Sequence, residues 1–212
     1  MKGIRFGNVH SYNDLHLILA EKQIGTPNVK KVLLDLPGGH GKIDQTEAFG
    51  EVKYDNRELS FDFSTIVPQE QFMDLFSQVQ NALHGKKMRI ILDDDPAWFY
   101  TGRVEVSEWK ANKRVGKLTI DCDCDPFKQS LQTTTVSQRV TSNANIILPN
   151  DKMPVVPTIT TTTAFLISFG GYNDEYPAGT FIIPELELHE GNNQVYVEGN
   201  GNITFTWQKG RL

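Results

Sequence analysis

Apolar and polar residues alternate on both sides of a short turn between residues 51 and 63, and this pattern most constrains how the chain can fold. Apolar side chains recur at every second position in residues 52–54 and again in residues 59–63. A period of two is typical of strands that bury one face. Because Asp55-Asn56-Arg57 separates the two runs, the pattern predicts a β-hairpin here.

A glycine-rich turn precedes this predicted hairpin. Residues 32–36 are an apolar run typical of a short strand, and Pro37-Gly38-Gly39-His40-Gly41 must end it, since proline removes a donor and glycine tolerates positive φ. A phosphate-binding loop would need Ser or Thr after its lysine. Ile43 follows Lys42 instead, so we interpret the segment as a turn and expect no nucleotide.

One helix is predicted, from Pro68 to about His84. Proline suits the first helical position, and Gly85 is a typical stop after the last turn. Apolar residues at helical spacing form one stripe, which we expect to pack on a sheet. The stripe comprises Phe72, Leu75, Phe76, Val79 and Leu83.

Strands are expected around this helix. They span residues 4–6, 88–92, 98–106 and 115–122. Gly102 interrupts the third of these and predicts a bulge, while residues 110–113 form a polar turn. Residues 15–19 fit either a helix opened by a capping box at Ser11 or a strand, and their alternation favours the strand.

Composition changes near residue 126 and predicts two domains, residues 1–126 and 127–212. The first carries 16 of the 21 Lys and Arg residues, while threonine rises from 5 residues before the boundary to 12 after it, which indicates sheet in the second. After a polar connector at residues 129–135, strand patterns cover residues 155–162, 164–169, 180–183, 185–189, 194–198 and 202–207. The fold is therefore predicted to be mainly β, with an α+β first domain containing one helix and a small antiparallel β-sandwich as the second.

Charge and hydropathy argue against two classes of partner. The net charge of −5 does not favour general binding to nucleic acid, which needs clustered Lys and Arg. No apolar run approaches the roughly 20 residues of a membrane helix, and Met1-Lys2-Gly3 opens no secretory leader. We expect a soluble chain that does not enter the secretory route.

Neither a metal site nor catalytic machinery is indicated. His10, His16 and His40 lack a metal-ligand spacing. Residues 93–95 are three successive aspartates, which favour a solvated turn over a cation site. Cys122 and Cys124 are two apart, a spacing that fits reduced core thiols better than a disulfide or a zinc knuckle. With no nucleophile and base in a known pattern, we expect no enzyme and no cofactor.

Several stretches taken together resemble the distal tail proteins (Dit) of long-tailed, non-contractile phages and prophages. They are GIRFG at residues 3–7, HSYNDL at 10–15, LPGGHGKIDQTE at 36–47, YDNREL at 54–59, LHGK at 83–86, DDPAWFY at 94–100, GRV at 102–104, EGNN at 190–193 and GNITFTWQKGRL at 201–212. Their order and spacing span nearly the whole chain. The threonine-rich residues 158–163 and the short second domain depart from the family pattern.

The resemblance implies a ring-forming first domain of sheet plus helix, and a sandwich similar to galectins or carbohydrate-binding modules. It also implies a structural protein that forms a homohexameric ring at the tail tip of the virion, assembled in the host cytoplasm. In the family, that ring joins the tail-tube protein to the tail-associated or baseplate protein. DNA would pass through its channel without specific binding, and an acidic ring would repel the DNA rather than hold it.

Residues in both domains are candidates for contact with partners. The predicted hairpin is a natural joint between neighbouring subunits, because exposed hairpins and sheet edges can pair. Its residues are Tyr54, Asp55, Asn56, Arg57, Glu58 and Leu59. An alternative function is recognition of host cell-wall glycan by the sandwich, which would need an exposed aromatic platform. Its candidates are Tyr172, Tyr176 and Trp207.

Overall fold

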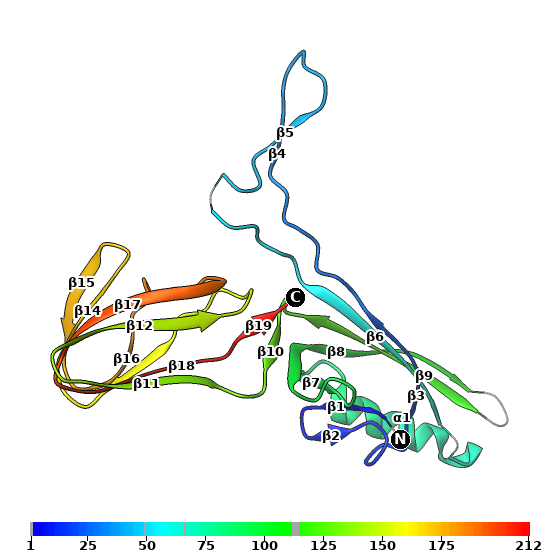
Figure 1. The fold of residues 1–212 in the computed structure, drawn as a ribbon. Coiled ribbons are helices and arrows are strands. Elements are labelled where there is room, and N and C mark those ends of the chain that lie inside the picture. The colour runs from blue at the N-terminus through cyan, green and yellow to red at the C-terminus, as the bar shows by residue number, and fades with distance from the viewer. Residues whose placement is uncertain (1, 49, 66, 112–114) are drawn as a thin grey trace. The chain divides into compact units, whose positions relative to one another are not determined.

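The computed structural model describes residues 2–48, 50–65, 67–111 and 115–212, and the chain divides into two compact units, Met1–Pro126 and Phe127–Leu212 (Figure 1). The first unit combines an antiparallel sheet, a helix and a two-stranded arm. The second unit pairs two antiparallel sheets. The predicted fold class, mainly β with a helix and a C-terminal antiparallel sandwich, is confirmed.

The main sheet of the first unit has the strand order β2-β1-β7-β8-β9-β6-β3. Its strands are β1 (Ile4–Phe6), β2 (Val9–His10), β3 (Ile18–Ile24), β6 (Arg57–Thr65), β7 (Lys87–Leu92), β8 (Trp98–Ala111) and β9 (Gly116–Cys124). A separate two-stranded sheet consists of β4 (Leu33–Asp35) and β5 (Lys42–Asp44). The ambiguous segment at residues 15–19 becomes a strand from Ile18 onward, while Leu15 and Leu17 are buried just before it.

The predicted hairpin at residues 51–63 is wrong in its pairing. The alternation of its second half is present, because Leu59, Phe61 and Phe63 on β6 are buried. β6, however, pairs with β3 on one side and β9 on the other, and neither partner is its neighbour in sequence. Tyr54 forms an isolated bridge with Val29. Local alternation identifies a strand and its buried face, but it does not identify a distant partner.

The helix is shorter than predicted. Pro68 is not helical, because its backbone is extended with ψ of 147°, and a 3₁₀ turn at Gln69–Gln71 precedes α1 (Phe72–Leu83). The expected stop is present, since His84 leaves the helix and Gly85 has a φ of +77°. The apolar stripe packs against the sheet. Phe76 stacks on Trp109 of β8 with ring centroids 5.1 Å apart. β8 extends past the predicted end at residue 106 because its pairing with β9 continues to Ala111.

Gly102 is not a bulge, contrary to the sequence prediction. The register of β8 and β9 shifts between Val106 and Glu108 instead. Gly102 lies where the two strands approach closely, and a Cβ there would be 2.3 Å from the Cys124 sulfur. Of the predicted polar turn at residues 110–113, Lys110 and Ala111 belong to β8, and residues 112–113 lie outside the described residues.

Cys122 and Cys124 are buried, free thiols, as predicted. Both side chains belong to the main apolar core of the first unit. Burial raises the pKa of both thiols, that of Cys124 to about 12. A thiol held in its protonated form is a poor nucleophile and a poor metal ligand, so these residues serve packing.

Two four-stranded sheets form the sandwich of the second unit. One has the order β11-β18-β13-β16 and the other β12-β17-β14-β15. The strands are β11 (Thr134–Val140), β12 (Asn143–Asn150), β13 (Thr158–Thr161), β14 (Phe165–Phe169), β15 (Tyr172–Tyr176), β16 (Gly179–Ile182), β17 (Gly191–Gly199) and β18 (Gly201–Trp207). The short strands β10 (Lys128–Ser130) and β19 (Gly210–Arg211) pair with each other. Alternate residues of both sheets, among them Ile159, Ile167 and Phe205, form a second core.

Five strands of the second unit, including the short β10 and β19, were not predicted from the sequence, and one predicted strand is absent. β11 begins within the supposed connector, and β12 and β15 had no prediction. Residues 185–189 do not form a strand, although Leu186 and Leu188 are buried as their alternation implies. Their backbone forms a turn bond from Leu186 N to the Ile183 carbonyl and an isolated bridge between Leu188 and Val155.

Candidate functional site

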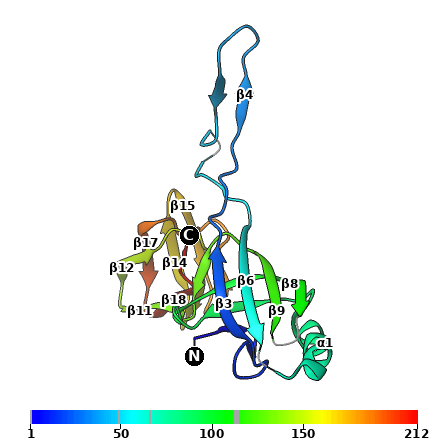
Figure 2. The same cartoon turned by 90° about the vertical axis from the view of Figure 1, so that its right-hand side faces the viewer.

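A two-stranded arm leaves the main sheet between β3 and β6, over residues 25–48 and 50–56, and we call this segment the arm. Both views show it projecting away from the sheet (Figures 1 and 2). Leu34 pairs with Ile43 in the outer half of the arm, which we define as residues 32–43. In the inner half, residues 25–31, 44–48 and 50–56, Lys30 N donates to the Lys53 carbonyl at 2.9 Å. The arm is thus a hydrogen-bonded ladder over much of its length.

Apolar side chains in the outer half of the arm are open to solvent. Leu33, Leu34, Leu36 and Ile43 are 44%, 47%, 48% and 44% exposed. A two-stranded hairpin has no second layer that could cover them, and in isolation such a hairpin is at best marginally stable. The apolar run at residues 32–36 predicted the strand correctly. Its partner strand β5 contains Lys42 and Asp44 besides Ile43. The contrast between an apolar strand and a mainly polar partner is the sequence feature that could have indicated an exposed arm.

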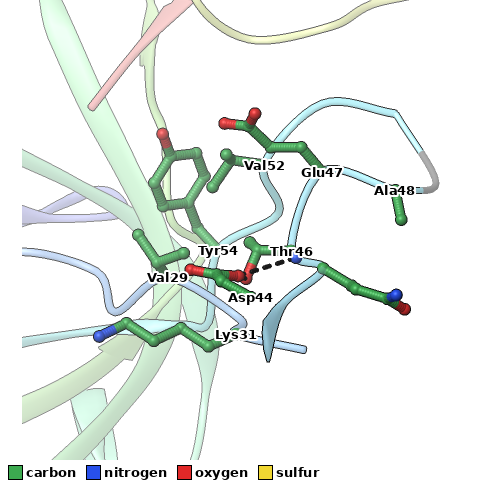
Figure 3. A pocket seen from close by; sticks show the side chains of 9 residues that line it. Val29, Lys31, Asp44, Thr46, Glu47, Ala48, Val52 and Tyr54 are labelled. Atoms are coloured by element: carbon green, nitrogen blue, oxygen red, sulfur yellow. Dashed lines mark hydrogen bonds between the residues drawn. The ribbon is translucent and has the colours of Figure 1, made fainter. Parts of the chain in front are cut away.

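The inner half of the arm encloses an open cavity of about 700 Å³ (Figure 3). Val29, Val52 and Tyr54 supply apolar surface, while Lys31, Asp44 and Glu47 add charge. Figure 3 shows Val52 beside Tyr54, with the Asp44 carboxylate hydrogen-bonded to Thr46. Those bonds from Thr46 hold the pKa of Asp44 below its ordinary value, so the carboxylate is ionised at neutral pH.

The six candidate contact residues lie where the arm joins β6. Arg57 and Leu59 are 5% and 0% exposed, and the Arg57 guanidinium lies 5.4 Å from the centre of the Tyr100 ring. Asp55, Asn56 and Glu58 are exposed, and Tyr54 is half-buried. These residues do not form the predicted hairpin. Only Tyr54, Asp55, Asn56 and Glu58 offer surface to another molecule.

The outward face of the main sheet carries a group of carboxylates, which we call the acidic face. Glu58 of β6 lies opposite Asp123 of β9, and Glu105 of β8 lies opposite Asp121. All four line a shallow cavity of about 270 Å³. Like charges directly opposite each other destabilise a sheet. Ser60 Oγ relieves part of this by donating to Asp121 at 2.6 Å.

The three successive aspartates and His10 are occupied by structural contacts. Asp93 accepts hydrogen bonds from Gly3 N at 2.7 Å and from His10 Nε2 at 3.0 Å. Burial opposes ionisation of Asp93, but these bonds outweigh it and hold its pKa below the ordinary value. Lys22 donates to Asp94. Among the described residues, no three His, Cys, Asp or Glu side chains are grouped as metal ligands.

The structure brings two of the three candidate platform residues together and separates the third. Tyr172 and Tyr176 share a hydroxyl hydrogen bond on β15, which raises the pKa of Tyr172 to about 12. Phe169 stacks on Tyr172 at 4.9 Å, and Phe181 stacks on Tyr176 at 4.6 Å. Neither phenylalanine was predicted from the sequence to belong to this group. Trp207 is 3% exposed in the sandwich core, so its ring is not available as a platform.

The fold has a solved counterpart over its whole length. No family model and no curated protein matches the chain. The structure is similar to that of the phage SPP1 Dit protein (gp 19.1), with a TM-score of 0.75 and 17% identity, covering 100% of both chains. The chain has the fold of a phage distal tail protein. The SPP1 protein is described as a paradigm of the hub adsorption apparatus in phages that infect Gram-positive bacteria.

The family resemblance seen in short sequence stretches is therefore supported by a fold that matches from end to end. The match includes both units, so the second unit is also part of the shared architecture. Within the described residues, no helix is both long enough and apolar enough to cross a lipid bilayer.

Proposed function

We propose that this protein is a structural hub of the distal tail of a long-tailed, non-contractile phage or prophage. The full-length similarity to a distal tail protein carries the proposal, because both units and their order are matched. In this role, six copies form a ring that joins the tail-tube protein to the tail-associated or baseplate protein. The protein acts by assembly rather than catalysis, and its place is the tail tip of the virion.

The first unit supplies surfaces suited to a ring. A single heterologous contact, repeated with rotation, closes into a ring without any further type of contact. The half-buried Tyr54 and the exposed Asp55, Asn56 and Glu58, where the arm joins β6, are our candidates for part of that contact. The acidic face is our candidate for the channel wall, since its carboxylates would repel DNA phosphates and let DNA pass.

Absolute mass in solution tests the ring directly. Light scattering across a concentration series is expected to approach six times the 23.9 kDa chain mass, about 143 kDa. Negative-stain images should then show ring-shaped particles with a central hole. A monomer at every concentration, with or without purified tail-tube protein, would contradict the proposal. So would a channel wall found to be lined by Lys and Arg.

A second candidate function is glycan binding by the sandwich, and the row of four aromatic rings at β14, β15 and β16 favours it. Stacked rings next to hydroxyl groups can hold a sugar through its apolar face and its polar edge. Fold similarity alone does not transfer this activity.

Binding to purified cell-wall polysaccharide tests the second candidate. Tyr172→Ala is expected to weaken binding about tenfold or more, because it removes one ring and the hydroxyl partner of Tyr176. Ile147→Ala, an equally simple truncation of a side chain that is 56% exposed on β12, serves as the control and should bind normally. Equal binding by both variants, or no binding by the natural protein, would remove this function.

A further inference from the structure

A carboxylate lies in the middle of the row of four aromatic rings on the sandwich. Tyr172, Asp174 and Tyr176 are alternate residues of β15, so their side chains extend to the same face of that strand. At about 3.3 Å per residue, Asp174 is roughly 6.6 Å along the strand from each tyrosine. Its partner on β14, Ile167, is fully buried, yet Asp174 is exposed because β15 is the last strand of its sheet. The open edge of the sandwich therefore presents a carboxylate between two tyrosines.

Glu185 brings a second carboxylate to these rings. The hydrogen bond with Tyr176 raises the pKa of Tyr172, and the negative charges of Asp174 and Glu185 act in the same direction. Charges on exposed groups are felt only at short range in salt solution, so both carboxylates lie near the Tyr172 hydroxyl. Both side chains are exposed, and the four rings are half-buried. Aromatic surface and negative charge are thus accessible together.

No cation of the described chain neutralises these two carboxylates. Asp174 accepts a hydrogen bond from Glu175 N at 2.9 Å, and within the described residues neither Asp174 nor Glu185 forms an ion pair. Residues 153–208, which include β13 to β18, contain six Asp and Glu residues and no Lys or Arg. Carboxylates without a counter-ion attract a cation, and the face of an aromatic ring also binds an ammonium group. The charge that complements this edge of the sandwich is positive.

We propose that the aromatic row binds a glycan with free ammonium groups, an amino sugar without its acetyl groups, in preference to a neutral sugar. The rings would contact the apolar face of the sugar, and Asp174 and Glu185 would accept hydrogen bonds from its ammonium groups. The paired hydroxyls of Tyr172 and Tyr176 favour a hydroxyl-bearing ligand over a lysine side chain, whose only polar group is its ammonium. This inference rests on the proposed glycan-binding function of the sandwich and names the class of sugar that the site selects.

Calorimetric titration with two oligomers of equal length tests this selectivity. One is a glucosamine oligomer and the other an N-acetylglucosamine oligomer, both at about pH 6, where a free amine is protonated. We expect the natural protein to bind the glucosamine oligomer about tenfold more tightly or better. The preference should shrink at high salt, because salt screens exposed charges.

Asp174→Asn isolates the contribution of the central carboxylate. The amide oxygen can still accept the bond from Glu175 N, so we expect unchanged binding of the N-acetylglucosamine oligomer. Binding of the glucosamine oligomer should weaken about threefold or more, because one charge partner of the ammonium groups is lost. Glu198→Gln is the matched control. Glu198 is exposed and alternates on β17 with the buried Val197, so it lies on the outer face of its sheet and should not affect the preference.

The outcomes separate this selectivity from glycan binding itself. Equal affinity for the two oligomers, or no binding of either while cell-wall polysaccharide still binds, overturns the selectivity and leaves glycan binding intact. An equal loss of preference in Glu198→Gln would assign the effect to the net charge of the unit, which also overturns it. So would oligolysine that binds as tightly as the glucosamine oligomer, since the site would then recognise charge without sugar. If no glycan binds at all, the glycan-binding function is removed and the selectivity with it.

Discussion

Gly102→Ala is expected to destabilise the first unit by about 3 kcal/mol, a large effect for the addition of one methyl group. The new Cβ would lie 2.3 Å from the Cys124 sulfur and 2.6 Å from the Asp123 carbonyl oxygen. The second of these is a backbone atom in the centre of the sheet, where Gly102 is paired with both Met88 and Cys124. Replacing glycine in a strand would otherwise gain about 0.5–1 kcal/mol, so the steric conflict decides the sign.

Denaturant unfolding followed by tryptophan fluorescence measures this effect, because Trp98 and Trp109 report on the first unit. Gly39→Ala is a matched control in the exposed arm, where the new Cβ comes no closer than 3.2 Å to a side-chain atom of Leu36. We expect that control to change stability by no more than about 0.5 kcal/mol. A loss below about 1 kcal/mol for Gly102→Ala would mean that β8 and β9 separate more easily than their close approach implies.

Local patterns in the sequence predicted those features that depend on neighbouring residues. The stripe of α1, the buried alternation of Leu59 to Phe63 and the buried pair of cysteines were all correct, because side-chain periodicity reports which face of an element is buried. Which strands pair with each other could not be predicted from the sequence in the same way. β6 lies between β3 and β9, and pairing over such sequence distances leaves no local pattern.

The candidate surfaces show the same limit. Leu33, Leu34 and Leu36 are exposed because β4 and β5 form a sheet of their own, separate from the main sheet. An apolar run in the sequence predicts a strand, but it does not indicate whether a second layer covers that strand. Phe169 lies opposite Tyr172 in the β14–β15 pair, and Phe181 stacks on Tyr176 from β16 of the other sheet, so both contacts join residues that are not adjacent in sequence. Conversely, strict alternation at residues 185–189 predicted burial correctly and a strand incorrectly.

Two core truncations are expected to destabilise the two units separately. Phe61 and Phe205 are both fully buried, but they belong to different apolar clusters that share no residue. Replacing a buried phenylalanine with alanine costs about 3–5 kcal/mol through lost burial and the cavity left behind. For units of this size, such a loss lowers the unfolding midpoint by more than about 10 °C.

Calorimetry of the single variants tells whether each core supports its own unit. Phe61→Ala should lower the midpoint of one transition and leave the other in place, and Phe205→Ala should do the reverse. Fluorescence assigns the transitions, because Trp207 lies in the second core whereas Trp109 packs on α1 in the first unit. If either truncation moved both transitions together, the chain would unfold as one cooperative body. Independent transitions would mean that the aromatic row can be altered while the other unit remains folded, which the glycan-binding experiments require.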